Sequence, residues 1–118
     1  MSYQKERDEF VGVIVGELSE QPGGGNRIAD ATALARLILR NAQTIQRLAV
    51  EDCNRELTTG ERMQISSCTE RINAACKPWG ITPNYSGDPR GACVKLLLPS
   101  GRWNSGGGAD DGYCVPTR

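Results

Sequence analysis

Residues 31–57 carry one continuous apolar stripe at helical spacing, and this stripe limits the folds open to the chain. Apolar residues that recur every three or four positions lie on one face of an α-helix. The stripe consists of Leu34, Ile38, Ile45, Leu48, Ala49 and Cys53. Asp30 precedes it and is typical of a helix N-cap. We therefore predict a long helix whose basic residues, among them Arg36, Arg40 and Arg47, lie largely off the apolar face.

A further helix is predicted shortly after this one. Thr58 and Glu61 are spaced as a capping box, in which each side chain satisfies a backbone N–H of the other residue. The apolar stripe that follows is Ile65, Cys68, Ile72, Ala75 and Cys76. Lys77, Pro78 and Gly80 predict its end. Because a short turn joins the two helices, we expect them to form an antiparallel hairpin.

The N-terminal segment predicts a shorter helix over residues 3–19. Phe10, Ile14 and Leu18 recur at four-residue intervals. Gly12 and Gly16 weaken a helix, because glycine loses more backbone entropy than alanine. A strand over residues 11–15 is the alternative. Residues 21–26 contain one proline and three glycines and predict a linker.

The C-terminal third predicts a small antiparallel sheet. Residues 92–98 form an apolar run between a glycine and a proline, which is typical of a strand. A turn follows this strand, and residues 102–104 are expected to form a strand that returns antiparallel to it. Residues 81–85 and 113–115 are further strand candidates. The expected fold class is α+β: a helical hairpin (27–79) packed on this sheet (80–118), preceded by a short helix (1–20) and the linker (21–26). With 118 residues the chain is long enough for a single domain.

Composition and charge exclude several classes of function. The 14 basic and 14 acidic residues give no net charge, which argues against a polybasic nucleic-acid or membrane binder. The apolar run near the N-terminus is far shorter than a membrane span, and it lacks the pattern of a signal peptide. We expect a cytoplasmic protein with no membrane association.

The cysteines and the missing histidine bear on chemistry. None of the five cysteines is part of a C-x-x-C pair, so no metal and no cofactor is expected. We interpret them as reduced thiols in the core, with one disulfide as the alternative in an exported chain. The chain has no histidine, which removes the commonest general base and the Ser-His-Asp arrangement. A function other than catalysis is favoured.

The candidate contact residues lie in the predicted sheet region. The segment from Gly87 to Gly91 predicts a turn, with the Arg90 guanidinium able to meet a phosphate or carboxylate. The expected contact surface consists of Asp88, Arg90, Arg102, Trp103 and Asn104. The alternative for residues 87–91 is a turn that only starts a strand. For the basic residues of the long helix, a solvated face with ordinary ion pairs is favoured over a phosphate-binding stripe.

Glycine and aspartate residues follow this surface in the sequence. Residues 106–108 are glycines, but they lack the pattern of a P-loop and do not open a helix. Asp110 and Asp111 are expected to form a solvated acidic turn rather than a cation site. Trp79 is expected to pack between the hairpin and the sheet.

Two segments carry a resemblance to a known family. They are RNAQTIQRLAVEDCN at residues 40–54 and GDPRGACVKLLLPSGRWNSGGG at residues 87–108, closed by GYCVP. The chain resembles a family of small uncharacterised proteins encoded by tailed bacteriophages and prophages. Ser105 stands where members often carry a tryptophan before paired glycines. The resemblance implies an accessory gene product that acts in the cytoplasm of a bacterial host.

Three functions follow as hypotheses. The first is a non-enzymatic binder of a host protein or protein complex, which serves host takeover or inhibits host defence as an anti-CRISPR protein does. The alternative is a small-ligand or nucleotide-binding protein that holds phosphate through arginines and backbone amides. A metal-dependent hydrolase using Asp88, Asp110 or Asp111 ranks last. A homodimer is compatible with the number of apolar positions on the hairpin.

Overall fold

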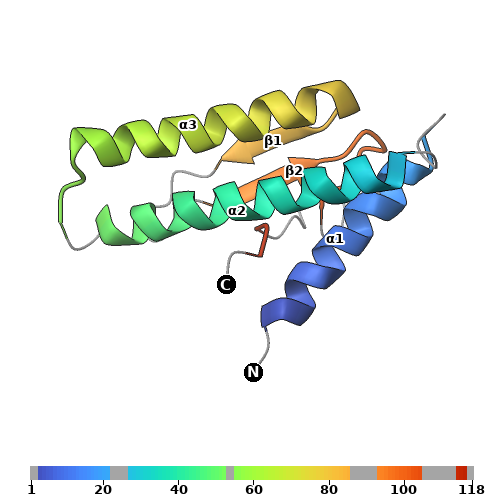
Figure 1. Ribbon diagram of the computed structural model, residues 1–118, viewed down its shortest axis with the longest axis horizontal. Helices are drawn as coiled ribbons and strands as arrows, with labels where there is room; N and C mark the ends of the chain where they lie inside the picture. The colour runs from blue at the N-terminus through green and yellow to red at the C-terminus, as the bar shows by residue number, and fades with distance from the viewer. Residues whose placement is uncertain (1–2, 22–26, 53–54, 86–92, 105–113, 117–118) are drawn as a thin grey trace.

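The computed structural model describes residues 3–21, 27–52, 55–85, 93–104 and 114–116. The elements are α1 (Tyr3–Ser19), α2 (Ile28–Asp52), α3 (Thr59–Cys76), the short 3₁₀ helix η2 (Lys77–Trp79), β1 (Thr82–Tyr85) and β2 (Val94–Leu97). Figure 1 shows α2 and α3 side by side and antiparallel, with the two strands along this hairpin. The predicted α+β fold is confirmed. No helix in these ranges is long and apolar enough to cross a membrane.

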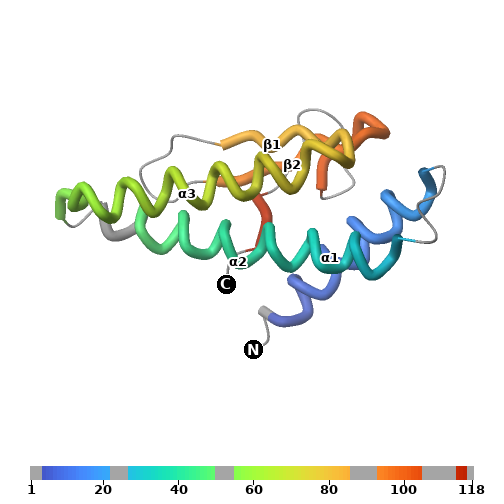
Figure 2. Tube along the Cα trace, turned by 45° about the horizontal axis from the view of Figure 1, so that its top comes forward, coloured from blue at the N-terminus to red at the C-terminus, as the bar shows by residue number. Residues whose placement is uncertain are grey.

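Helix α1 has the predicted bounds, so the alternative strand over residues 11–15 is wrong. Phe10, Ile14 and Leu18 are 4%, 0% and 0% exposed and belong to the core. Gly12 and Gly16 are exposed and have open space beside them, so the missing side chains leave the packing intact. In Figures 1 and 2, α1 lies beside the first half of α2, on the side away from α3. The burial of these three apolar side chains therefore holds α1 against α2.

Helix α2 differs from the prediction at both ends. It begins at Ile28, so Asp30 lies within its first turn and is not the N-cap. The Asp30 carboxylate lies 3.6 Å from Arg27 Nε, and an acidic side chain in the first turn still favours the helix dipole. The helix ends at Asp52 rather than at residue 57. Its buried residues follow helical spacing: Ala31, Leu34, Ala35, Ile38, Leu39, Ala42, Ile45 and Leu48.

The predicted capping box at the start of α3 is present. Thr58 Oγ1 accepts a hydrogen bond from the Glu61 backbone N–H at 3.1 Å, and Glu61 Oε1 accepts one from the Thr58 N–H at 2.9 Å. The Arg55 guanidinium donates to both Glu61 oxygens, at 2.8 and 2.6 Å. The bond from Arg55, followed by that from Thr58, lowers the pKa of Glu61 from 4.5 to about 2. An ionised Glu61 therefore holds the start of α3.

This pKa predicts a pH dependence of stability. A carboxyl whose pKa is lowered on folding stabilises the protein above its unfolded pKa, and this contribution is lost as the pH falls through the folded pKa. The window for Glu61 runs from about pH 4.5 down to about pH 2. Glu61→Gln should flatten the fall in unfolding free energy across that window, measured by urea denaturation at each pH. The control is Glu56→Gln, whose carboxylate is exposed. Equal pH profiles for wild type and Glu61→Gln would contradict this assignment.

The two strands pair antiparallel, with Thr82 opposite Leu97 and Pro83 opposite Leu96. The Leu96 N–H and C=O both bond to Asn104, on the edge of β2 away from β1. The pair of Leu96 with Pro83 is therefore one that exchanges no ladder hydrogen bonds. Because proline has no N–H to donate, this register places Pro83 where the sheet loses no ladder hydrogen bond.

Two aromatic residues connect the sheet region with the helices. Trp79 is buried in the core, as predicted, and the Arg27 guanidinium carbon lies 3.9 Å from its ring centroid. The Tyr85 hydroxyl donates to α3, where Asn73 Oδ1 lies at 2.9 Å and the Thr69 carbonyl oxygen at 3.2 Å. Burial raises the pKa of Tyr85 to about 12, so it stays a protonated donor at neutral pH.

Candidate functional site

The predicted contact surface near the sheet is only partly described. Asp88 and Arg90, like the glycine loop at residues 106–108 and Asp110 and Asp111, lie outside the described residues. Arg102 is exposed, and Trp103 is half-buried in an isolated antiparallel bridge with Leu97. The Trp103 Nε1 atom is buried, with no acceptor in the part of the chain that the structure describes.

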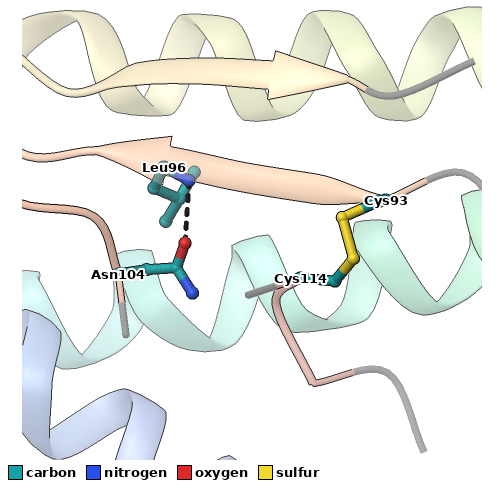
Figure 3. Close-up of a disulfide and its surroundings, with 4 residues drawn as sticks. All are labelled: Cys93, Leu96, Asn104 and Cys114. Carbon is teal, nitrogen blue, oxygen red and sulfur yellow. Dashed lines mark hydrogen bonds between the residues drawn. A yellow bond between two sulfur atoms is a disulfide. The ribbon is translucent and has the colours of Figure 1, made fainter. Parts of the chain in front are cut away.

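Asn104 is buried beside β2 and is not part of an exposed polar face, although it lines a cavity with residues of α1. It is 4% exposed. Its backbone N–H donates to the Leu96 carbonyl oxygen at 3.0 Å. Its Oδ1 accepts from the Leu96 N–H at 2.9 Å, the bond drawn in Figure 3. The side-chain amide thus replaces a backbone carbonyl beside β2, where an unpaired buried N–H would be costly. Asn104 completes the sheet edge.

The same strand is joined to the C-terminal segment by a disulfide. Cys93 and Cys114 are bonded, with their Cα atoms 5.1 Å apart (Figure 3). The Val115 N–H donates to the Val94 carbonyl oxygen at 2.7 Å. The expectation of reduced thiols is wrong for this pair. It is confirmed for Cys68 and Cys76, which are free and buried. Burial raises the pKa of Cys76 to about 12, so it stays a thiol.

The disulfide predicts a stability difference between oxidised and reduced protein. The two cysteines are 21 residues apart in sequence, and closing such a loop restricts the unfolded chain. The double variant Cys93→Ser/Cys114→Ser should lose about 3 kcal/mol of unfolding free energy in non-reducing buffer. Urea denaturation measures this loss, and dithiothreitol should bring the wild type to the level of the variant. A wild type that is no more stable than the variant without reductant would contradict the prediction.

A groove between α1 and α2 gathers arginine side chains from both helices. We call it the arginine groove. Helix α1 contributes Gln4, Arg7, Asp8 and Val11. Helix α2 contributes Arg36, Leu39, Arg40 and Gln43. The cavity volume is about 340 Å³. Figure 1 shows how the two helices diverge toward the N-terminus, and the groove lies in this angle.

The α1 wall of the arginine groove is ordered by hydrogen bonds. Gln4 Nε2 donates to Asp8 Oδ1 at 2.8 Å, and Gln4 Oε1 accepts from Arg7 Nη2 at 2.9 Å. Gln4 therefore connects the carboxylate of Asp8 with the guanidinium of Arg7. The hydrogen bond from Arg7 to Gln4 orients its guanidinium at the α1 wall of the groove.

The α2 wall carries two positive charges one turn apart. Arg36 and Arg40 are exposed, and neither forms an ion pair with any described residue. The expected ordinary ion pairs are thus not found for these two arginines. Like charges four residues apart destabilise a helix by a few tenths of a kcal/mol. With three arginines and one aspartate, the groove lining has a net positive charge that an anion would neutralise.

Sequence reasoning singled out Arg36 and Arg40 but missed Arg7. The missed signal is a shared spacing: both walls use positions i, i+3, i+4 and i+7 of their helix. Each wall also holds one apolar residue, Val11 or Leu39. Residues at these four spacings lie along one side of a helix, next to its buried face. Which two flanks meet depends on how α1 packs on α2. Arg47 is exposed and does not line the groove.

No cluster of three or more cysteine and acidic side chains that could hold a metal is found among the described residues. Comparison with protein-family models, with curated proteins and with solved structures gives no match for this chain. The resemblance to the phage protein family is therefore carried by the two sequence segments alone.

Proposed function

We propose that this chain is a small phage-encoded accessory protein that binds a host macromolecule without catalysing a reaction. The observation that carries the proposal is the arginine groove, where Arg7, Arg36 and Arg40 line one cavity. Arg36 and Arg40, which form no ion pair with a described residue, supply donors for an anionic partner, and guanidinium groups match carboxylates and phosphates geometrically. The sequence resemblance supplies the phage origin and the role in host takeover or inhibition of host defence.

The lining of the arginine groove suits binding better than catalysis. Among the described residues, it contains arginine and glutamine donors, one carboxylate and two aliphatic side chains, and no serine, threonine, cysteine, lysine or tyrosine. A covalent mechanism through a hydroxyl, thiol or amine needs such a nucleophile and an adjacent base. The chain has no histidine to serve as that base. Arg102 and Trp103 remain proposed as a second contact area.

The proposed compartment is the cytoplasm of the bacterial host. A persistent disulfide such as Cys93–Cys114 is instead typical of an oxidising compartment. None of the residues that line the arginine groove is a cysteine. The proposed binding surface is therefore available whether the disulfide is formed or reduced.

Affinity capture with matched charge variants tests this function. We expect the wild-type protein to retain a reproducible set of host proteins from a bacterial lysate. The variant Arg36→Glu/Arg40→Glu should lose this set by about tenfold or more, because two charge-assisted contacts become repulsive. The control Arg47→Glu/Arg62→Glu changes the net charge equally at exposed sites outside the groove and should retain it. Mass spectrometry quantifies the captured proteins, and circular dichroism checks that both variants fold.

Two results would count against the proposal. Equal capture by the groove variant and the control variant would mean that the arginine groove is not the binding surface. A covalent change or cleavage in the captured protein after incubation with wild type, absent with the groove variant, would contradict a function without catalysis.

A further inference from the structure

The arginine groove combines charge with an apolar floor. Val11 is half-buried and packs against the core, and Leu39 is 6% exposed. They lie in the same cavity as the three guanidinium groups. A ligand that fits this lining has negative charges at its edges and an apolar group between them. A simple inorganic anion would leave Val11 and Leu39 without a contact.

The size of the arginine groove favours side chains over a folded element. Pockets that enclose small molecules have volumes of roughly 300–1,000 Å³. At about 340 Å³ this cavity takes one apolar side chain with its charged neighbours. Arg36 and Arg40 are one helical turn apart, about 5–6 Å between their Cβ atoms. Two carboxylates on a short peptide segment can meet them at that spacing.

The surroundings of the arginine groove disfavour a nucleic acid. Single-stranded nucleic acids are held by aromatic side chains that stack on the bases, and the described residues that line the groove include none. A phosphate backbone also needs a basic surface that extends along the strand. Here Asp8 lies within the lining, Glu6 and Glu9 are exposed on the same helix, and the whole chain has no net charge. These carboxylates interrupt the basic surface along α1.

We propose that the arginine groove binds a short acidic segment of a partner protein, with carboxylates on Arg36 and Arg40 and an apolar side chain on Val11 and Leu39. Arg7, which Gln4 orients, lines the same cavity from α1 and adds a third positive charge. This inference rests on the proposed function, because it names the chemistry of the partner that the groove takes. It predicts affinity that falls with added salt, since exposed charge pairs are screened.

A random library of 12-residue peptides on an array tests the inference, probed with the labelled full-length protein at physiological salt. The strongest binders should be enriched in aspartate and glutamate with an aliphatic residue between them. Arg36→Gln/Arg40→Gln should lose this enrichment, and the control Arg47→Gln/Arg62→Gln should keep it. For the strongest peptide, fluorescence anisotropy should give an affinity about tenfold weaker with the groove variant. Replacing its glutamates by glutamines should weaken binding similarly.

Three outcomes would overturn the inference: binders that are not acidic, enrichment that persists in the groove variant, or tighter binding of a 12-nucleotide single-stranded DNA than of the best peptide. The capture experiment separates this failure from failure of the proposed function. If host capture depends on Arg36 and Arg40 while acidic peptides do not bind, the groove is the binding surface and only the partner chemistry is wrong. If capture does not depend on them, the proposed function itself fails.

Discussion

The packing of α1 on α2 is the constraint on which the candidate site depends. Phe10, Ile14 and Leu18 are buried along one side of α1, and they join the core that α2 organises. Burying such side chains contributes roughly 1.5–3 kcal/mol each. This burial places the polar flank with Gln4 and Arg7 beside Arg36 and Arg40. The arginine groove is therefore a consequence of where the apolar side chains of α1 find their partners.

Strand β2 is the element on which the arrangement of the sheet region depends. It pairs with β1 on one edge, and on the other edge it bonds to Asn104 and Val115. The disulfide between Cys93 and Cys114 closes the same edge. A two-stranded sheet alone is marginally stable in water. Asn104, Val115 and the disulfide thus hold β2 in place from this edge.

The sequence was a good guide to the elements and a poor guide to how they meet. Helical periodicity predicted the bounds of α1, the spacing of Thr58 and Glu61 predicted their capping box, and an apolar run between glycine and proline predicted the strand that contains Val94. These features depend on neighbours within a few positions of the chain. The burial of Asn104, the Cys93–Cys114 disulfide and the arginine groove depend on residues brought together from distant positions. Two flanks with the same i, i+3, i+4, i+7 spacing were visible in the sequence, but the packing of α1 decides that they face each other.

The central claim is that arginines from two helices act as one anion-recognising group. Nuclear magnetic resonance of the arginine Nε–Hε groups, in protein titrated with the best acidic peptide, tests it most directly. The account predicts that the signals of Arg7, Arg36 and Arg40 shift together along one binding curve, while those of Arg47 and Arg62 stay unchanged. A titration in which Arg36 and Arg40 shift without Arg7, or in which all exposed arginines shift alike, would contradict it.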